Sequence, residues 1–225
     1  SVCDYFHAKA RELNQRWYSQ VPDEYRLAFL PVDTKEGAHY LNWMQLSMDF
    51  AKENREKMML AVKAILEKWI GKYTGFSLEF SHDLNCHHNY ASLENHYGKD
   101  VWVHRKGAVS AQSGELAVIP GAMGSYSYVV MGKGNPESFC SSSHGAGRQY
   151  SRKGAMAAFS CEEVILDLQK QGVILGKKGK ADVAEESRFA YKNIEEVMDS
   201  LTTKEVTKVK NKSTKDLLVI IPAYN

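Results

Sequence analysis

The chain has 225 residues, of which 44% are hydrophobic and 25% charged, with a formal net charge of +2. This composition excludes a wholly disordered chain, and no apolar run approaches the ~20 residues of a membrane-spanning helix. The balanced charge neither requires nor excludes a nucleic-acid ligand, because it can include a basic patch. The four cysteines form no CxxC pair, which favours a reducing compartment such as the cytoplasm.

Two helices are predicted in the first third of the chain. Apolar residues recur at helical spacing over residues 2–20. A longer helix of about 35 residues is predicted from Asp33, which can cap it together with Glu36. Its apolar residues alternate in steps of three and four, which indicates a long packing helix. A coiled-coil dimer is the alternative, although Arg55 would interrupt its seam.

The middle third predicts a glycine-rich antiparallel region. Phe76, Leu78 and Phe80 alternate with polar residues, which is typical of a strand. Glycines punctuate the following segments and predict tight turns between them. Further strands are predicted at Val101–Arg105, Glu115–Ile119 and Tyr126–Met131.

Helices return in the last third. Ser151 can cap a short helix, and Ser160 with Glu163 has the spacing of a capping box. A further helix is predicted over about Arg188–Leu201, and two closing strands over about Glu205–Lys210 and Leu217–Ile221. The sequence therefore predicts an α+β fold with three parts: a helical part over 1–70, a β-rich site region over 71–147 and a closing α+β part over 148–225.

Six of the eight histidines lie within residues 82–144, most densely in the segment 82–90 (HDLNCHHNY). Imidazole and thiolate are ligands for zinc and related metal ions. On a strand, the adjacent His87 and His88 would point to opposite faces, so at most one would serve a given site. Surface and core histidines are the simpler interpretation. A metal-binding domain remains an alternative, built from His82, Cys86 and His96.

Two glycine-rich segments are candidates for phosphate binding. Residues 119–127 (IPGAMGSYS) either form an anion-binding nest of backbone N–H groups or a plain turn. In residues 141–148 (SSSHGAGR), His144 lies among small residues, with Arg148 and Arg152 close behind. A neutral imidazole can act as a nucleophile, and arginine binds phosphate with two parallel hydrogen bonds. Neither a Walker nor a Rossmann motif occurs, so no standard nucleotide-binding fold is implied.

Four strings of the sequence resemble motifs of the RtcB family of RNA ligases, in the family's order. They are residues 86–91 (CHHNYA), 104–108 (HRKGA), 120–124 (PGAMG) and 143–148 (SHGAGR). Residues 26–33 (RLAFLPVD) and 190–194 (AYKNI) are also similar, so the resemblance covers nearly the whole chain. It implies a GTP- and manganese-dependent ligase that joins RNA 2′,3′-cyclic phosphate or 3′-phosphate ends to 5′-hydroxyl ends, in tRNA splicing or RNA repair.

The resemblance also implies roles for individual residues. His144 matches the family's histidine nucleophile, which is guanylylated and passes GMP to the RNA 3′-phosphate. His88 matches a ligand of the Mn²⁺ ion, and no role is implied for His87, His104 or Arg105. The nucleotide contacts implied beside His88 and His144 are Asn89, Pro120, Gly121, Ala122, Met123, Ser127, Gly145, Ala146 and Gly147.

The sequence also departs from the family. The upstream motifs D-x-x-C-G, N-H-F-x-E and H-x-G-S-R-G are not found, and Cys3 lacks their context. The family's terminal lysine–glycine pair is not found either, the nearest lysines being Lys212 and Lys215. We therefore expect a C-terminal half, starting at Ser1, that is active only with the missing N-terminal half. Expected partners are RNA such as tRNA halves, the missing N-terminal half and an archease-like activator, and no membrane is expected.

The alternative is a catalytically incomplete remnant that binds nucleotide or RNA without joining it. Retention of RNA would then depend on a basic patch and would weaken with salt. A solvated pair of strands is the simpler interpretation of the same residues. The candidate patch comprises Lys204, Lys208, Lys210, Lys212 and Lys215.

Overall fold

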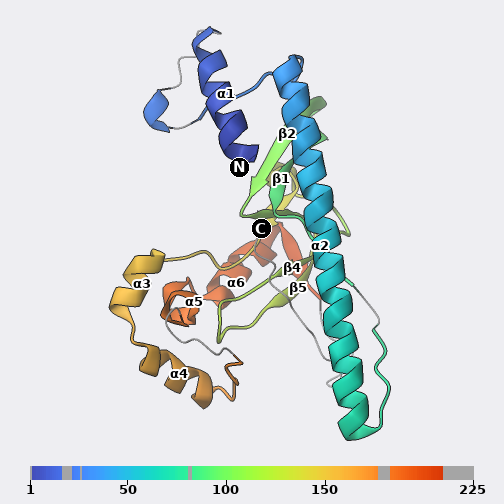
Figure 1. The fold of residues 1–225 in the computed structure, drawn as a ribbon, viewed down its shortest axis with the longest axis vertical. Coiled ribbons are helices and arrows are strands. Elements are labelled where there is room, and N and C mark those ends of the chain that lie inside the picture. Colours follow the sequence, from blue (N-terminus) through green and yellow to red (C-terminus); the bar gives the residue numbers. More distant parts are fainter. Residues whose placement is uncertain (1, 17–21, 26, 81–82, 177–182, 210–225) are drawn as a thin grey trace. The chain divides into compact units, whose positions relative to one another are not determined.

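The computed structural model describes residues 2–16, 22–25, 27–80, 83–176 and 183–209 (Figure 1). They form two compact units, and the boundary between them in the sequence lies between Ser77 and Leu78. Six α-helices and several short antiparallel strands occur in the described part, which confirms the predicted α+β class. None of the described helices is both long and apolar enough to cross a membrane.

Unit 1, which precedes Leu78, contains α1 (Val2–Arg16), the 3-10 turn η1 (Asp23–Tyr25) and α2 (Lys35–Thr74). The buried side chain of Asn14 in α1 binds both backbone groups of Phe29: Nδ2 donates to its carbonyl oxygen at 2.6 Å, and Oδ1 accepts from its N–H at 3.2 Å. The rings of Phe6 and Tyr40 pack edge to face at 5.4 Å. These contacts join α1 to the connecting segment and to the start of α2.

Replacing Asn14 with alanine should lower the free energy of unfolding by about 1–3 kcal/mol, because two backbone groups lose a buried partner. Urea denaturation followed by circular dichroism measures the change. Gln15→Ala, at the exposed neighbouring amide, is the matched control and should leave the midpoint in place. Equal midpoints for both variants would contradict this role of Asn14.

The long helix α2 begins one residue later than predicted. Its N-cap is Thr34, whose Oγ1 accepts from the N–H of Gly37 at 3.1 Å, so the expected cap Asp33 is wrong and lies outside the helix. At the other end, Gly75 adopts a left-handed conformation with φ +73° and donates to the carbonyl of Gly71.

The predicted apolar packing face of α2 is half-buried over much of its length and exposed toward its end. Within this helix only Gly37 is buried, whereas Ile65 and Trp69 are 55% and 45% exposed. Within unit 1, α1 has 15 residues and α2 has 40. At 1.5 Å per residue the shorter helix spans roughly 40% of the longer one.

Unit 2 contains three small antiparallel sheets. The hairpin β1–β2 turns through Tyr97 and Gly98, both with positive φ, as a two-residue hairpin turn requires. The second sheet pairs β3 with β6, and the third has the order β4-β5-β7. The strands are β1 (Asn89–His96), β2 (Lys99–Lys106), β3 (Ala108–Ser110), β4 (Leu116–Ile119), β5 (Tyr128–Gly132), β6 (Ser141–Ser143) and β7 (Val206–Lys208).

The helices of unit 2 enclose two hydrophobic clusters. Ile119, Val130 and Met198 are fully buried where α6 covers the β4-β5-β7 sheet. The second cluster joins α4 to α5, which lie together with α3 in Figure 1, and it contains Val164 and Leu168. The helical elements are η2 (Pro136–Ser138), α3 (Arg152–Ala158), α4 (Cys161–Lys170), α5 (Val183–Glu186), η3 (Arg188–Ala190) and α6 (Ile194–Lys204).

Most predicted elements of unit 2 are confirmed, with shifted ends. Both capping predictions hold: Ser151 caps α3, and Ser160 with Glu163 forms the capping box of α4. The strands predicted around 101–105, 115–119 and 126–131 correspond to β2, β4 and β5.

Three predictions are wrong or lie outside the described residues. The alternating segment 76–80 is not a strand: it has no regular secondary structure, and Phe76 is 73% exposed. The helix predicted over 188–201 is divided, because Asn193 caps a new helix, α6. The strand β7 pairs with β5, whereas its predicted partner at 217–221 and most of the basic patch lie outside the described residues.

Candidate functional site

Two histidines that are far apart in the sequence stack against each other in unit 2. His88 lies directly before β1, and His144 lies directly after β6. Their ring centroids are 5.1 Å apart with an interplanar angle of 17°. Both side chains are half-buried. The two histidines implied by the RtcB resemblance as metal ligand and nucleophile therefore lie in one place.

Gly107, between β2 and β3, fixes the backbone of both histidines. Its N–H donates to the carbonyl of His88 at 3.1 Å, and its carbonyl accepts from the N–H of His144 at 3.3 Å. It has φ +73°, and a methyl group in place of its hydrogen would lie 3.6 Å from Cε1 and 3.7 Å from Nδ1 of His144. The glycine of the string HRKGA thus has a structural role that the sequence analysis missed.

Replacing Gly107 with alanine should cost about 1–2 kcal/mol, because an L residue is strained in the left-handed region. Because its N–H and carbonyl bind the backbone of His88 and His144, relief of this strain should also displace the His144 ring. Thermal unfolding measures the first effect, and the loss of the nuclear Overhauser effect between the two imidazoles measures the second. Gly98→Ala, at a hairpin turn with φ +75° and open space around it, is the control. Gly98→Ala should lower the unfolding temperature in the same way but keep the Overhauser effect between the two imidazoles. Loss of the Overhauser effect in both variants would contradict a local role of Gly107.

The loop after His144 is held by its own small residues. The hydroxyl of Ser143 donates to the carbonyl of Gly145 at 2.7 Å, and the N–H of Lys192 donates to the carbonyl of Gly147 at 2.9 Å. The buried Ala146 packs into the hydrophobic cluster around Ile119. Gly147 has φ +76°, and a methyl group there would meet nothing within 4 Å. The loop is therefore fixed by contacts among its own residues and with Lys192.

The segment 120–127 lies beside this loop. A methyl group on Gly145 would lie 3.3 Å from the carbonyl oxygen of Pro120, so only glycine permits the approach without displacement. The N–H of Gly121 donates to Oγ of Ser127 at 3.1 Å, and a methyl group on Gly121 would overlap the carbonyl oxygen of Tyr126 at 2.0 Å. The predicted segment is therefore a tight turn next to His144.

The far end of the same turn is fixed to α5 and η3. The N–H of Met123 donates to the carbonyl of Glu186 at 3.1 Å, and its carbonyl accepts from the N–H of Arg188 at 3.0 Å. The carbonyl of Ala122 accepts from the N–H of Ser125 at 2.8 Å. The backbone of the segment is thus held at both ends.

Arg148 is engaged by neighbouring residues. Its guanidinium lies over the ring of Tyr191 at 4.8 Å, Nη1 donates to the Tyr191 hydroxyl at 2.9 Å, and Glu186 lies 3.8 Å away. Nη2 is buried with no hydrogen-bond partner among the residues that the structure describes. Burial raises the pKa of Tyr191, and Glu186 adds to this rise while Arg148 opposes it. Arg152, the other predicted phosphate ligand, is exposed at the start of α3.

The opposite-face prediction for His87 and His88 is wrong in its premise, because both precede β1 and neither is on a strand. Their surroundings nevertheless differ: the ring of His87 lies 5.9 Å from the ring of Tyr90, whereas His88 stacks on His144. Asn89 is the exposed first residue of β1 and lies opposite Lys106.

A family model described as tRNA-splicing ligase RtcB matches residues 1–220. This chain belongs to the RtcB family. It is 38% identical over 202 residues to the RNA-splicing ligase RtcB of Escherichia coli strain K12, 36% over 208 residues to the tRNA-splicing ligase RtcB of Nanoarchaeum equitans and 34% over 203 residues to the RNA-splicing ligase RtcB of Mycobacterium tuberculosis.

These alignments cover most of the chain and less than half of each relative. The covered share of this chain is 88%, 84% and 82%, and that of the relatives is 48%, 43% and 45%, in the same order. The chain therefore spans about half the length of the curated RtcB proteins that it matches.

The described part of the chain does not contain a complete ligand set for the metal ion that the RtcB resemblance implies. No group of three or more His, Cys, Asp or Glu side chains there is arranged to hold a metal ion. Of the alternative set, Cys86 contacts the carbonyl of Leu116 at 3.9 Å and His96 binds Glu94 at 2.9 Å, while His82 lies outside the described residues. His88 alone supplies an imidazole beside His144.

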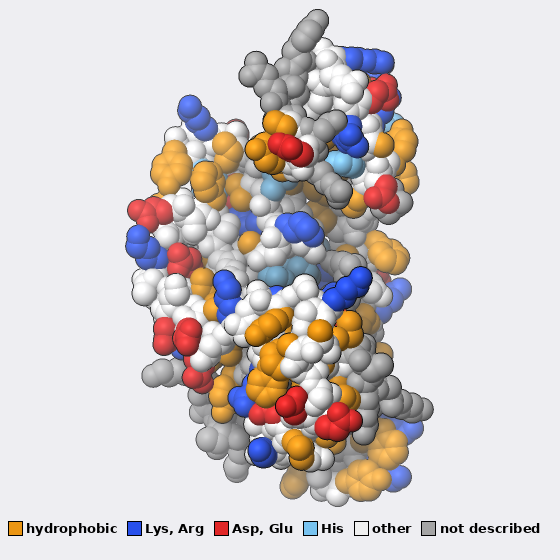
Figure 2. Space-filling view, turned by 90° about the vertical axis from the view of Figure 1, so that its left-hand side faces the viewer, with side chains coloured by type: hydrophobic (Ala, Val, Ile, Leu, Met, Phe, Trp, Pro, Cys, Tyr) orange, Lys and Arg blue, Asp and Glu red, His pale blue; other side chains and the backbone are white. Residues whose placement is uncertain are grey.

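A shallow cavity of about 390 Å³ lies away from these histidines, along α4 and η3. Figure 2 shows hydrophobic side chains gathered with acidic ones on the face that α3 and α4 present. None of the predicted site residues lines the cavity. Its lining comprises Phe159, Glu163, Leu166, Asp167, Lys170 and Phe189.

Proposed function

We propose that this chain carries the nucleotide-transfer part of a GTP- and manganese-dependent RNA ligase, in which His144 becomes covalently linked to GMP. The observation that carries the proposal is the stacking of His88 on His144 at 5.1 Å. Membership of the RtcB family and relatives named RNA-splicing ligase support the same activity. Because the chain spans about half of those relatives, its activity requires the N-terminal half of such a protein.

His144 has the surroundings that a histidine nucleophile needs. Gly145 and Gly147 carry no side chain that could block access to the imidazole, and the ring stays half-buried. An unprotonated ring nitrogen attacks the α-phosphorus of GTP, so that a P–N bond forms, the bond to the bridging oxygen breaks and pyrophosphate leaves.

The RNA then takes the nucleotide from the enzyme. An oxygen of the RNA 3′-phosphate attacks the phosphorus, the P–N bond breaks and His144 is regenerated. The 5′-hydroxyl of the second RNA strand attacks the activated 3′-phosphate, loses its proton and displaces GMP. A 2′,3′-cyclic phosphate must first be hydrolysed to the 3′-phosphate.

The turn beside His144 would hold the guanine nucleotide. Glycines let a ligand approach the backbone of this turn closely, because no Cβ intervenes. Ser127 closes the turn by accepting from the N–H of Gly121, and Asn89 supplies a polar side chain next to His88 in the sequence. The proposed contacts are His88, Asn89, Pro120, Gly121, Ala122, Met123, Ser127, His144, Gly145, Ala146 and Gly147.

Manganese, when bound, would neutralise phosphate charge and favour attack at phosphorus. His88 is the residue of this chain that we assign to it, and the other ligands would come from the N-terminal half. RNA with a 3′-phosphate or cyclic phosphate end, including tRNA halves, is the proposed substrate. An archease-like activator and a cytoplasmic location complete the proposal.

The proposal is tested with GTP labelled at the α-phosphate, manganese and this chain mixed with the N-terminal half of an RtcB protein. We expect an acid-labile protein adduct that is absent from His144→Ala. The matched control is His104→Ala, at an exposed histidine on β2, and it should form the adduct normally. No adduct in the wild-type mixture, together with salt-sensitive RNA retention, would overturn the proposal in favour of a binding remnant.

A further inference from the structure

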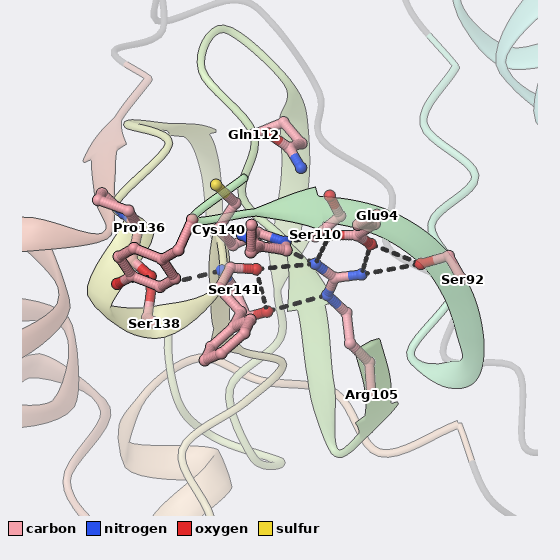
Figure 3. Close-up of polar contacts among 12 residues, drawn as sticks. Ser92, Glu94, Arg105, Ser110, Gln112, Pro136, Ser138, Cys140 and Ser141 are labelled. Atoms are coloured by element: carbon pink, nitrogen blue, oxygen red, sulfur yellow. Dashed lines mark hydrogen bonds and ion pairs between the residues drawn. The ribbon is translucent and has the colours of Figure 1, made fainter. Parts of the chain in front are cut away.

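We propose that Arg105 is a positioning residue, which sets the strand carrying His144 in register with His88. The inference rests on the proposed role of His144 and adds a residue to which the family resemblance assigned none. Arg105 lies on β2, two residues before Gly107, and is only 2% exposed. Figure 3 shows its guanidinium at the centre of a polar network that spans β1, β2 and the segment before β6.

On one side, the guanidinium binds Glu94 of β1 with two parallel contacts, Nη1 to Oε1 and Nη2 to Oε2, the latter at 3.0 Å. Glu94 also accepts from the hydroxyl of Ser92 at 2.5 Å and pairs with Nε2 of His96 at 2.9 Å. Burial by itself would raise the pKa of Glu94, but the hydrogen bonds from Arg105, Ser92 and His96 outweigh it and lower the pKa to about 2. The carboxylate therefore stays ionised and holds Arg105 in place.

On the other side, the same guanidinium binds the segment that leads into β6. Nε donates to Oγ of Ser141 at 3.0 Å, and Nη2 donates to the carbonyls of Phe139 at 3.0 Å and Cys140 at 3.5 Å. Phe139 and Cys140 have φ +51° and +48°, a left-handed region that is strained for residues other than glycine. Such a turn persists only where surrounding contacts impose it, and Arg105 supplies three of them.

The position of this turn determines the position of His144. The strand β6 has only three residues, Ser141–Ser143, and His144 follows directly. It pairs with β3 in the register Ser110↔Ser141 to Ala108↔Ser143. A three-residue strand has few ladder bonds of its own, so its register depends on what holds its ends. Arg105 holds the first end of β6, and Gly107 holds the last.

Arg105 cannot itself touch a nucleotide, because it is buried and its donors already face protein acceptors. Besides Glu94, Ser141 and the two carbonyls, Nη1 lies 3.3 Å from the hydroxyls of both Tyr90 and Ser92. We therefore assign it an effect on the geometry of His144 and none on the affinity for GTP.

The test compares Arg105→Lys with the wild type, since lysine keeps the charge but lacks the fork of donors. We expect the Overhauser effect between the imidazoles of His88 and His144 to disappear while far-UV circular dichroism is unchanged. With the N-terminal half added, the rate constant of adduct formation should fall by about 100-fold, and KM for GTP should change by less than about threefold. Lys99→Ala, at an exposed lysine on the same hairpin, should match the wild type.

Ser141→Ala keeps the test decisive if Arg105→Lys does not fold, because it removes only the acceptor of Nε. Ser141→Ala should weaken the Overhauser effect between the two imidazoles and lower the rate constant of adduct formation by about tenfold. An undiminished Overhauser effect in either folded variant would overturn the inference, as would a rise in KM without loss of rate. The Overhauser effect needs no GTP, so an inactive wild type would refute the proposed function and still leave this inference tested.

Discussion

Replacing Gly121 with alanine should destabilise unit 2 by about 3 kcal/mol or more and slow formation of the GMP adduct by about 100-fold. The added methyl group would lie 2.0 Å from the carbonyl oxygen of Tyr126 and 2.9 Å from Cβ of Ser125. One of these clashes is with backbone, so the turn must open and the hydrogen bond from Gly121 to Ser127 must break.

Thermal unfolding and adduct kinetics at a temperature where the variant is folded measure the two effects of Gly121→Ala. Gly176→Ala is the matched control, because a methyl group there meets nothing within 4 Å and the residue has no positive φ. A Gly121→Ala protein with the stability and adduct rate of this control would contradict the tight turn beside His144.

Unit 2 should lose stability in acid through Glu94. Its pKa is about 2 in the folded chain against an ordinary value of 4.5, so its contribution is fully present above about pH 4.5 and is lost as the pH falls toward 2. The shift corresponds to at most about 3 kcal/mol, because one pKa unit equals about 1.4 kcal/mol. The side chain is 15% exposed, so solvent screening reduces this only modestly.

Glu94→Gln isolates this effect. At neutral pH the variant should be about 3–5 kcal/mol less stable than the wild type, since Arg105 is left buried without its counter-charge. Between pH 4.5 and 2 its free energy of unfolding should change less than that of the wild type. The control is Glu137→Gln, which breaks an ion pair with Lys204 whose side chains are 69% and 64% exposed. It should behave like the wild type, because exposed ion pairs contribute little. Parallel pH curves for wild type and Glu94→Gln would refute the role of this carboxylate.

Elements with local signals were predictable from the sequence. The capping box of Ser160 and Glu163 depends on residues three apart, and the structure has it where the spacing places it. The alternation of Phe76, Leu78 and Phe80 has the right period for a strand, but the segment is not a strand, because the period alone does not decide the conformation. The strand β1 was missed because it is rich in Asn, Glu and His, and its pairing with β2 decides its conformation.

The motifs of the site were visible in the sequence, but their arrangement was not. The contact between His88 and His144 arises from the pairing of β3 with β6 and from the backbone bonds of Gly107, which are non-local. Arg105 was noted as part of the string HRKGA without a role, since a charged residue is ordinarily exposed. Arg105 lay on a predicted strand, but Glu94 lies on β1, which was not predicted, so the sequence analysis had no signal of the buried pair.

The central claim is that His144 accepts GMP in a site shared with His88. Peptide mapping by mass spectrometry, after incubation of the complemented protein with GTP and manganese, tests it most directly. We expect one GMP per chain on the peptide that contains His144, none in His144→Ala and strong reduction in His88→Ala. A GMP adduct on another residue, or undiminished labelling of His144→Ala, would contradict it.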